Sequence, residues 1–482
     1  MGDLLRWWPA LLALAIPVAQ ASAAYHLIIR RRDVRSAAGW MGLIWLAPVI
    51  GVVLYALFGI NRIKRKARSV RAGGSDYKAW IPDPGEQGDA LRAHLGDQWR
   101  HLLRLAPLGD RVTGRPLLGG CSIQPLVNGA QAYTAMLEAI DKAERSITLL
   151  SFIFDADRVG RRFAEALGQA VDRGVDVRVL IDAVGARYSV PRMAGHLKRH
   201  GVRVAHFMPA LFPWRTPYVN LRNHRKIMVV DGHVAFTGGM NIRAEFWPES
   251  ADEYGARDLH FKVEGPVVCE IQEAFAEDWT FTTGERLEGT LWFPRPEPTG
   301  SSMARGIRDG PDIDFENIQL MLMGALSVAR SSVRIITPYF LPDQQLISAL
   351  NVCAMRGVQV EVILPAKSNQ KLVQWACNAQ LDQMLERGVR VFASPDPFDH
   401  SKLTLVDACW VLFGSANWDP RSLQLNFEFN VEAYDPPMAA QLGELFRERR
   451  EASREVTLEE LASRPVPVKV RDGVARLFSP YL

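Results

Sequence analysis

The sequence of 482 residues has few cysteines, and they lie far apart. No two of them form a CxxC pair; they are Cys121, Cys269, Cys353, Cys377 and Cys409. This spacing argues against a disulfide framework and against a cysteine zinc site, so we expect reduced and mostly buried thiols. With 48% hydrophobic and 23% charged residues, the composition excludes a wholly disordered or low-complexity protein. It suffices for two or three globular units.

Acidic residues are scarce in residues 1–71, where only Asp3 and Asp33 stand against 11 Lys and Arg, a net charge of +9. Because the whole chain carries +4, residues 72–482 carry a net charge of −5. A net acidic body does not suit a protein that binds nucleic acid, since the partner is itself an anion. We therefore expect no nucleic-acid partner.

Charge is missing altogether from two N-terminal stretches, Trp7–Ile29 and Ala37–Ile60. At 1.5 Å per residue in a helix, each is long enough to cross a bilayer core of ~30 Å. Basic residues follow both stretches, and aromatic residues lie near their ends, where the interface favours them. The pattern predicts a membrane anchor over residues 1–66, with transmembrane helices at about 7–29 and 37–60.

The first stretch has a second interpretation as a signal peptide, because Ala21-Ser22-Ala23 has the pattern of a cleavage site. Asp3 weakens the positive charge that such a peptide needs, so we favour an uncleaved anchor. The positive-inside rule does not choose an orientation decisively, since basic residues flank the second stretch on both sides. The six Lys and Arg of residues 62–71 favour a cytoplasmic body that is attracted to anionic headgroups.

The rest of the chain divides into a linker, expected over residues 67–110, and two similar halves at 111–295 and 296–482. In each half an apolar strand leads to a helical run and then to a second strand, beginning at ERSITLLSFIFDAD in one and RSSVRIITPYFLPD in the other. Such β-α-β order predicts an α/β fold with a mostly parallel sheet in each half. We therefore interpret residues 111–295 and 296–482 as two copies of one domain.

Both halves carry one polar motif, HxKxxxxD followed by GxxN. The first copy contains His224, Lys226, Asp231 and Asn241, and the second contains His400, Lys402, Asp407 and Asn417. The offset between copies is 176 residues throughout. A single copy of this motif could be no more than the solvent-exposed face of a strand. Two complete copies in similar sequence surroundings indicate that the motif residues have a function.

The spacing has a physical reason. On a strand, His and Lys two residues apart point to the same face, and the Asp that follows the strand suits a hairpin turn that returns Asn beside them. Imidazole can act as nucleophile or proton carrier, while lysine and asparagine donate hydrogen bonds to phosphate oxygens. Two such sets facing each other about a pseudo-twofold axis would bind one phosphodiester from both sides. We expect Asp231 and Asp407 to hold the hairpin turns and not to touch substrate.

These paired motifs resemble the phospholipase D superfamily, and their surroundings resemble its bacterial cardiolipin synthases. The resembling segments are RNHRKIMVVDG, GGMNI, RDLHFKVEGP, TPYFLPD, HSKLTLVD, GSANWDPRSLQLNFEFN, LFGINRIKRK and LFSPYL. The resemblance implies duplicated phospholipase D-like α-β-α sandwich domains behind a transmembrane hairpin, in a bacterial inner membrane. Asn369, where the family often has Asp, and the proline-rich residues 392–399 depart from the family pattern and bear on acceptor preference.

The resemblance also implies a reaction, in which one phosphatidylglycerol transfers its phosphatidyl group to another through a phosphohistidine, giving cardiolipin and glycerol. His224 would be the nucleophile and His400 the acid and base, with the lysines and asparagines on the phosphate oxygens. No metal, ATP or other cofactor is needed.

A histidine in either role needs a carboxylate on its other nitrogen. The family-like candidates are Glu428 for His400 and Asp258 for His224, with Glu253 as the fallback. A surface ion pair is an equally good reading of Asp258.

Other readings stay open. Water as acceptor would make the chain a membrane-bound phospholipase D that releases phosphatidic acid, and another phosphatidyl transfer, a nuclease and a non-enzymatic scaffold are further alternatives. His196 and His200, four residues apart, could face a metal but favour a solvated basic helix. Residues 210–218 are aromatic and suit either a loop that covers the core or a lipid-facing lip.

Overall fold

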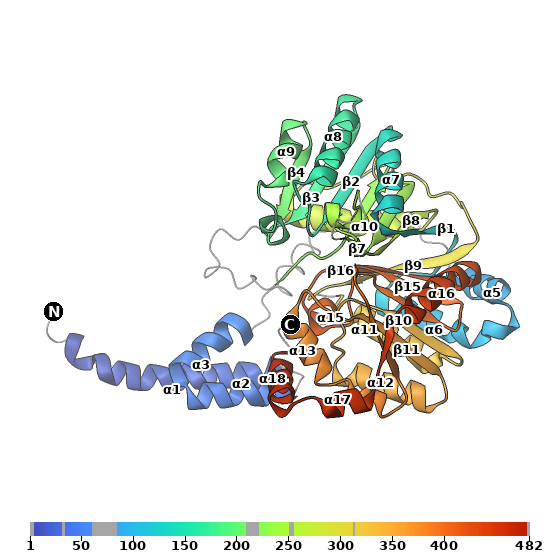
Figure 1. Cartoon of the computed structure of the whole chain (residues 1–482). Coiled ribbons are helices and arrows are strands. Elements are labelled where there is room, and N and C mark those ends of the chain that lie inside the picture. The colour runs from blue at the N-terminus through green and yellow to red at the C-terminus, as the bar shows by residue number, and fades with distance from the viewer. Residues whose placement is uncertain are drawn as a thin grey trace. The chain divides into compact units, whose positions relative to one another are not determined.

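The computed structural model describes residues 4–30, 34–59, 84–208, 221–249, 255–311 and 314–479 (Figure 1). Its contacts divide the chain into an N-terminal unit, residues 1–69 with 210–220, and a larger body, residues 70–209 with 221–482. Each is described by itself.

The N-terminal unit consists of helices α1 (Leu4–Arg30), α2 (Val34–Leu46) and α3 (Pro48–Leu54) and the π-helix η1 (Tyr55–Gly59). Leu27, Ile44 and Tyr55 form its buried cluster. The continuous helix expected over 37–60 is wrong, because the chain leaves the helical conformation at Ala47 (φ −130°, ψ 76°). Pro48 causes the break, since its ring disfavours a helical residue before it and it has no N–H to donate.

Of the two segments expected to span a membrane, residues 7–29 lie in α1, and the described residues 37–59 fall on α2, α3 and η1. Within the described ranges, no helix is both long enough and apolar enough to cross a bilayer.

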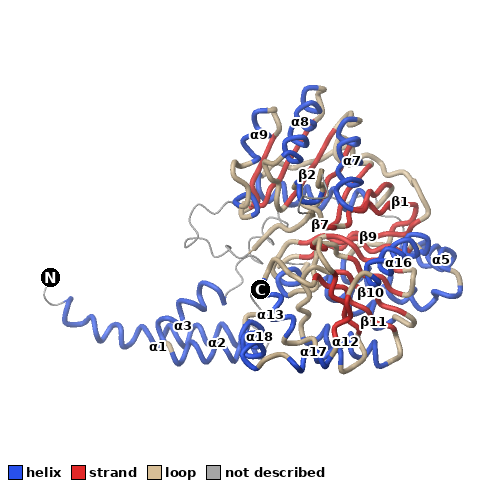
Figure 2. Tube along the Cα trace, viewed as in Figure 1, coloured by secondary structure: helices blue, strands red, loops and turns tan. Residues whose placement is uncertain are grey.

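The body is built on one mixed sheet of 15 strands (Figure 2). The strands of its first half are β1 (Leu118–Val127), β2 (Ser146–Ser151), β3 (Asp176–Asp182), β4 (Arg203–Phe207), β5 (Ile227–Val230), β6 (Val234–Gly238) and β8 (Leu259–Glu264). Those of its second half are β9 (Ser302–Asp309), β10 (Ser332–Ile336), β11 (Gln359–Pro365), β12 (Arg390–Ser394), β14 (Leu403–Val406), β15 (Trp410–Gly414), β16 (Glu428–Tyr434) and β17 (Arg454–Val456). Two short strands, β7 (Ala256–Arg257) and β13 (Phe398–Asp399), pair separately.

The order of the strands repeats outward from the middle of the sheet. There β1 pairs antiparallel with β9, with Leu118 opposite Ala304. From β1 the order is β8-β6-β5-β2-β3-β4, and from β9 it is β16-β15-β14-β10-β11-β12, followed by β17. The second copy of each element therefore lies at the corresponding place on the other side of the β1–β9 pair.

The expectation of a mostly parallel sheet in each half is wrong. In this sheet β2-β3-β4 and β10-β11-β12 pair in parallel, whereas β5-β6-β8 and β14-β15-β16 pair antiparallel. The reason is local, because the short turns after β5 and β14 reverse the chain, and a strand returned by a short turn lies antiparallel to its predecessor. The His and Lys of each motif lie just before β5 and β14 and not on them, so the expectation that they share one face of a strand is wrong.

Helices cover both faces of the sheet (Figure 1). On one face Ile147 of β2 packs in the cluster that includes α7 and α8, and on the other Thr148 donates to Gln272 of α10. The helices of the first half are α7 (Asn128–Asp141), α8 (Arg158–Asp172), α9 (Met193–Arg199) and α10 (Val268–Thr283). Those of the second half are α11 (Asn317–Val328), α12 (Gln344–Met355), α13 (Lys371–Asn378), α14 (Asp382–Leu385), α15 (Pro420–Gln424), α16 (Pro436–Glu451), α17 (Leu458–Ser463) and α18 (Val466–Leu477). This layering agrees with the expected α/β class.

The described part of the expected linker, 84–110, is folded. It forms α5 (Pro84–Leu95), the 3₁₀-helix η2 (Asp97–Arg104) and the start of α6 (Leu105–Thr113). Leu95, Leu102 and Leu105 are buried in the core of the second half, together with Ile307 and Leu322. Glycine and proline suggested a linker, but buried leucines from three successive short helices pack this segment against the body.

The cysteines agree with the expectation of free thiols. All five are free, and four are buried, whereas Cys269 is half-buried. Burial raises the pKa of the Cys377 thiol to about 12, so it stays protonated at neutral pH.

The aspartates of the two motifs hold the hairpin turns, as expected. Asp231 follows β5 with φ +52°, and its carboxylate accepts hydrogen bonds from the backbone N–H groups of residues 144–146. Asp407 accepts from the N–H groups of residues 330–332 and also from Nε2 of His101, at 2.6 Å. Each carboxylate thereby ties a hairpin to the start of the neighbouring strand.

We predict that Asp231→Ala and Asp407→Ala each lower the free energy of unfolding by ~3 kcal/mol, because three backbone donors lose their acceptor in each variant. Asp407→Ala should cost more, since it also releases His101 of η2. Denaturant unfolding measures the effect, with Asp97→Ala as control because that side chain is 87% exposed. Equal stability of all three variants would contradict the anchoring role.

Candidate active site

The backbone places each motif histidine against a strand of the opposite half. Asn223 forms a parallel bridge with Phe427, and the N–H of His224 donates to Phe427 O at 2.9 Å. At the corresponding place, β13 pairs in parallel with β7, and the N–H of His400 donates to Arg257 O at 2.7 Å. The segments that carry the histidines are therefore exchanged between the halves.

This exchange decides which carboxylate orients which histidine. Nδ1 of His224 lies 3.0 and 3.1 Å from the two oxygens of Glu428, and Nδ1 of His400 lies 2.8 Å from Asp258 Oδ2. The sequence-based pairing of Glu428 with His400 and of Asp258 with His224 is wrong. Each carboxylate directly follows the strand residue that accepts the opposite histidine's backbone N–H, so the pairing is crossed. In both histidines Nε2 remains the nitrogen available for reaction.

Both motif lysines are buried beside the histidines. Nζ of Lys226 donates to His224 O at 2.6 Å, and Nζ of Lys402 lies 3.0 Å from His400 Nδ1 and donates to His400 O. Burial lowers the pKa of Lys402 to about 8, although Asp258 and Glu428 oppose the shift. Burial likewise lowers the pKa of Lys226. Both carboxylates act on the pKa of each lysine, so the two lysines, Asp258 and Glu428 belong to one site.

The motif asparagines are buried as well. Asn241 Oδ1 accepts from the N–H of Ile153 at 3.1 Å, which orients its amide. Nδ2 of Asn417 donates to Ser422 Oγ at 3.1 Å, and among the described residues Asn417 Oδ1 has no hydrogen-bond partner. The two asparagines are thus held differently, and Nδ2 of Asn241 is the better placed to donate to an anion.

Burial keeps both imidazoles neutral. It lowers the pKa of His224 to about 4, a shift that Glu428 opposes and Lys226 enhances. It also lowers the pKa of His400, where Lys402, Lys226 and His224 add to the effect. A neutral imidazole has a lone pair on one nitrogen, which is the state that a nucleophile requires.

The two carboxylates differ in charge because their neighbours differ. Burial alone would raise the pKa of Glu428, but His224, Lys226 and the Ser415 hydroxyl outweigh it and lower the pKa. Ser415 Oγ and Asn426 Nδ2 both donate to this carboxylate. Burial raises the pKa of Asp258 to about 8, so this group keeps its proton at neutral pH.

Gly239 stands in the first motif where Ser415 stands in the second. A Cβ atom at Gly239 would lie 2.3 Å from Asp258 Oδ1, so the Asp258 carboxylate occupies the space that a side chain would need. Ser415 and Asn426 are therefore site residues that sequence reasoning missed. The sequence difference between GGMN at 238–241 and GSAN at 414–417 could have pointed to Ser415.

Aromatic rings surround the histidines. Phe152 lies 5.2 Å from His224 and 5.6 Å from Lys226 Nζ, and Tyr339 and Phe246 lie 6.4 and 5.9 Å from His400. Such walls exclude water, which strengthens the interactions between charges inside.

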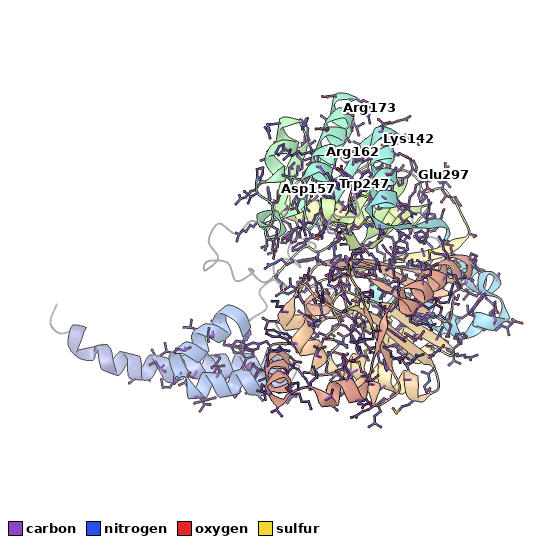
Figure 3. All side chains as sticks on the ribbon, viewed as in Figure 1. Lys142, Asp157, Arg162, Arg173, Trp247 and Glu297 are labelled. Carbon is purple, nitrogen blue, oxygen red and sulfur yellow. The ribbon has the colours of Figure 1, made fainter. Side chains whose placement is uncertain are left out.

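The cap of α8 holds the wall at Phe246 in place. Asp157 accepts from the N–H of Gly160 in α8 and from the N–H of Ala244, and Arg162 lies 5.2 Å over the ring of Trp247 (Figure 3). Phe246 is fixed between these two contacts.

Several expected residues are not part of this site or cannot be placed. Glu253 and residues 210–218 lie outside the described residues. His196 is exposed, and its ring nitrogen lies 2.9 Å from Arg199. In the described ranges, no group of three or more His, Cys, Asp and Glu side chains could hold a metal ion.

Two family models match the chain. The model described as cardiolipin synthase, PLD-like domain, matches residues 136–279 and 322–450, and so covers both HxK motifs. The model described as phospholipase D-nuclease N-terminal matches residues 18–59.

Cardiolipin synthase 1 of Bacillus cereus is 30% identical over 95% of this chain and 91% of its own length. The cardiolipin synthase of Geobacillus thermodenitrificans is 31% identical with the same coverage. A phosphatidylserine synthase of Haemophilus influenzae shares the fold, with a TM-score of 0.62 and 17% identity over 79% of this chain and all of that one. With its duplicated motif and this similarity over nearly its full length, the chain belongs to the cardiolipin synthases of the phospholipase D-like family.

Proposed function

We propose that this chain transfers the phosphatidyl group of one phosphatidylglycerol to a hydroxyl of a second one, giving cardiolipin and glycerol. The observation that carries this proposal is the crossed pair of imidazoles, each held through Nδ1 by a carboxylate of the opposite half. Two histidines so held have their reactive nitrogens available to one phosphorus.

In the first step, Nε2 of His224 forms a bond to phosphorus while the bond to the glycerol oxygen breaks. His224 suits this role because its Nδ1–H donates to the ionised Glu428, which leaves a lone pair on Nε2 and stabilises the positive charge that develops on the ring.

His400 supplies the proton that the departing glycerol oxygen needs. Asp258 and His400 together hold one transferable proton at neutral pH, because burial raises the pKa of Asp258 to about 8. As Nε2 of His400 gives its proton to glycerol, Nδ1 receives the proton of Asp258. In the second step the acceptor hydroxyl returns a proton to Nε2 and its oxygen displaces His224, which restores both pairs.

Positive charge stabilises both transition states. Lys226 and Lys402 and the amide of Asn241 donate to the non-bridging oxygens as negative charge shifts onto them. The exchange needs no nucleotide, since one phosphodiester replaces another.

We also propose the wider arrangement of the protein. Residues 111–295 and 296–482 are duplicated domains related by a pseudo-twofold axis, which the repeated strand order supports. Residues 1–66 anchor the chain as a multi-pass segment in a bacterial inner membrane with the body in the cytoplasm, which the N-terminal family match at 18–59 supports. The roles of the motif residues and of Asp258 and Glu428 belong to the same proposal.

His224→Ala and His400→Ala should each lower the rate of cardiolipin formation by about 10³-fold or more, because neither step proceeds without both imidazoles. The assay uses purified protein with phosphatidylglycerol as the sole lipid and resolves the products by mass spectrometry. The exposed His196→Ala is the control and should match the wild type. Phosphatidic acid as the only wild-type product would replace the proposal with a hydrolytic phospholipase D.

A donor that carries a p-nitrophenyl leaving group distinguishes the role of the His224–Glu428 pair from that of the His400–Asp258 pair. The p-nitrophenolate ion leaves without being protonated, so this donor does not require the general acid. His400→Ala and Asp258→Asn should then retain the burst of p-nitrophenol within ~10-fold, whereas His224→Ala and Glu428→Gln should lose it by roughly 10²-fold or more. Loss of the burst in Asp258→Asn together with its retention in Glu428→Gln would reverse the assignment.

The pH profile of kcat/KM should have an acid limit well below the ordinary pKa of histidine and a basic limit near pH 8. Protonation of His224 removes the nucleophile, and because burial lowers its pKa to about 4, activity should persist well below pH 6. Activity should fall as the pH rises through about 8, where Asp258 loses its proton and Lys402 its charge. Rates with soluble short-chain phosphatidylglycerol measure the profile, and an acid limit near the ordinary histidine value of ~6.5 would contradict it.

A further inference from the structure

Helix α18 exposes a row of apolar side chains. They recur at intervals of three or four residues, which places them on one helix face. Their exposed fractions are 71% for Val466, 59% for Val470, 50% for Val474, 77% for Leu477 and 54% for Phe478, just after the helix end. A contiguous apolar row on the surface of a soluble domain marks an interaction surface.

The opposite face of α18 is held against the body. Ala475 is buried with Ala376 of α13 and with Leu341. Asp472 is also buried, and its two oxygens lie 2.7 Å from the guanidinium groups of Arg464 and Arg471. These contacts fix the rotation of the helix, so its apolar row faces away from the body.

Basic side chains stand on both sides of the apolar row. At 100° per residue, Arg471 lies on one side of it, and Lys469 and Arg476 lie on the other. Arg471 also lies 4.3 Å over the ring of Trp375. Long basic side chains beside an apolar stripe suit a helix lying in a bilayer interface, because their stems follow the apolar surface while their charges reach the headgroups. This local excess of positive charge contrasts with the net −5 of residues 72–482.

We propose that α18 docks on an anionic bilayer. The docking of α18 does not depend on the proposed reaction. A bilayer offers an apolar interior beneath anionic headgroups, which is the combination that the row and its flanking charges match.

The depth of α18 in the bilayer tests the docking directly. The full chain with Val470→Cys carries an environment-sensitive fluorophore in vesicles of phosphatidylglycerol and brominated phosphatidylcholine. Native thiols interfere little, because four are buried and Cys269→Ser removes the fifth. The matched control is Val352→Cys on α12, which is 51% exposed.

We expect bromine to quench the label at position 470 at least twofold more than the label at position 352. Equal quenching at the two positions would overturn the proposal. Disulfide cross-linking of Val470→Cys chains to one another, without quenching by bromine, would also overturn it and would assign the row to a second copy of the chain.

Turnover provides a second and independent measurement. Val470→Glu combined with Val474→Glu should lower the rate on phosphatidylglycerol in vesicles by about tenfold, since charged side chains would replace the apolar ones that enter the bilayer. The rate on dihexanoyl phosphatidylglycerol in solution should stay within twofold, and Val352→Glu should leave both rates unchanged.

The outcomes separate the two proposals. Equal loss on both substrates would reject the docking role of α18 while leaving the proposed reaction intact. No cardiolipin from either substrate with the wild type would reject the proposed function, whereas quenching at position 470 would still support docking.

Discussion

The site depends on the exchange of two short segments between the halves of the body. Asn223–His224 adds to the strand edge at Phe427, and Asp399–His400 adds to β7 at Arg257. The same backbone contacts deliver Glu428 and Asp258 to the opposite histidines. Neither half therefore holds a complete imidazole–carboxylate pair of its own, and the central β1–β9 pairing that joins the halves is part of the catalytic geometry.

Within this nearly symmetric frame, a few side chains make the two pairs chemically different. His224, Lys226 and the Ser415 hydroxyl lower the pKa of Glu428 despite its burial, and Asn426 also donates to this carboxylate, whereas burial raises the pKa of Asp258. In a buried site, hydrogen bonds to the charged form decide whether a carboxylate keeps its proton. In the proposed reaction one pair then suits nucleophilic attack and the other suits proton transfer, and the difference between Gly239 and Ser415 distinguishes their surroundings.

Much of this could be predicted from the sequence, and the errors have identifiable causes. The HxK spacing, the hairpin turns at Asp231 and Asp407 and the α/β class all follow from local periodicity and turn chemistry. The proportion of parallel strand pairs was overestimated, because the hairpin turns after β5 and β14 were recognised locally but their consequence, antiparallel pairing of the strands they join, was not drawn for the sheet. Leu95 and Leu102 were assigned to a linker because of the glycine and proline residues that precede them, although both pack into the core of the second half. The break at Ala47 could have been predicted from Pro48.

What the sequence by itself determined is the inventory: two histidines, two lysines and two asparagines at a constant offset, each set flanking a strand–turn–strand hairpin that short-range rules specify. The tertiary structure alone decided which carboxylate faces which histidine, because that pairing depends on hydrogen bonds between segments far apart along the chain, such as His224 N–H to Phe427 O and His400 N–H to Arg257 O. It also decided the protonation of Asp258 and Glu428, since burial and neighbouring donors, which arise only on folding, set their pKa values.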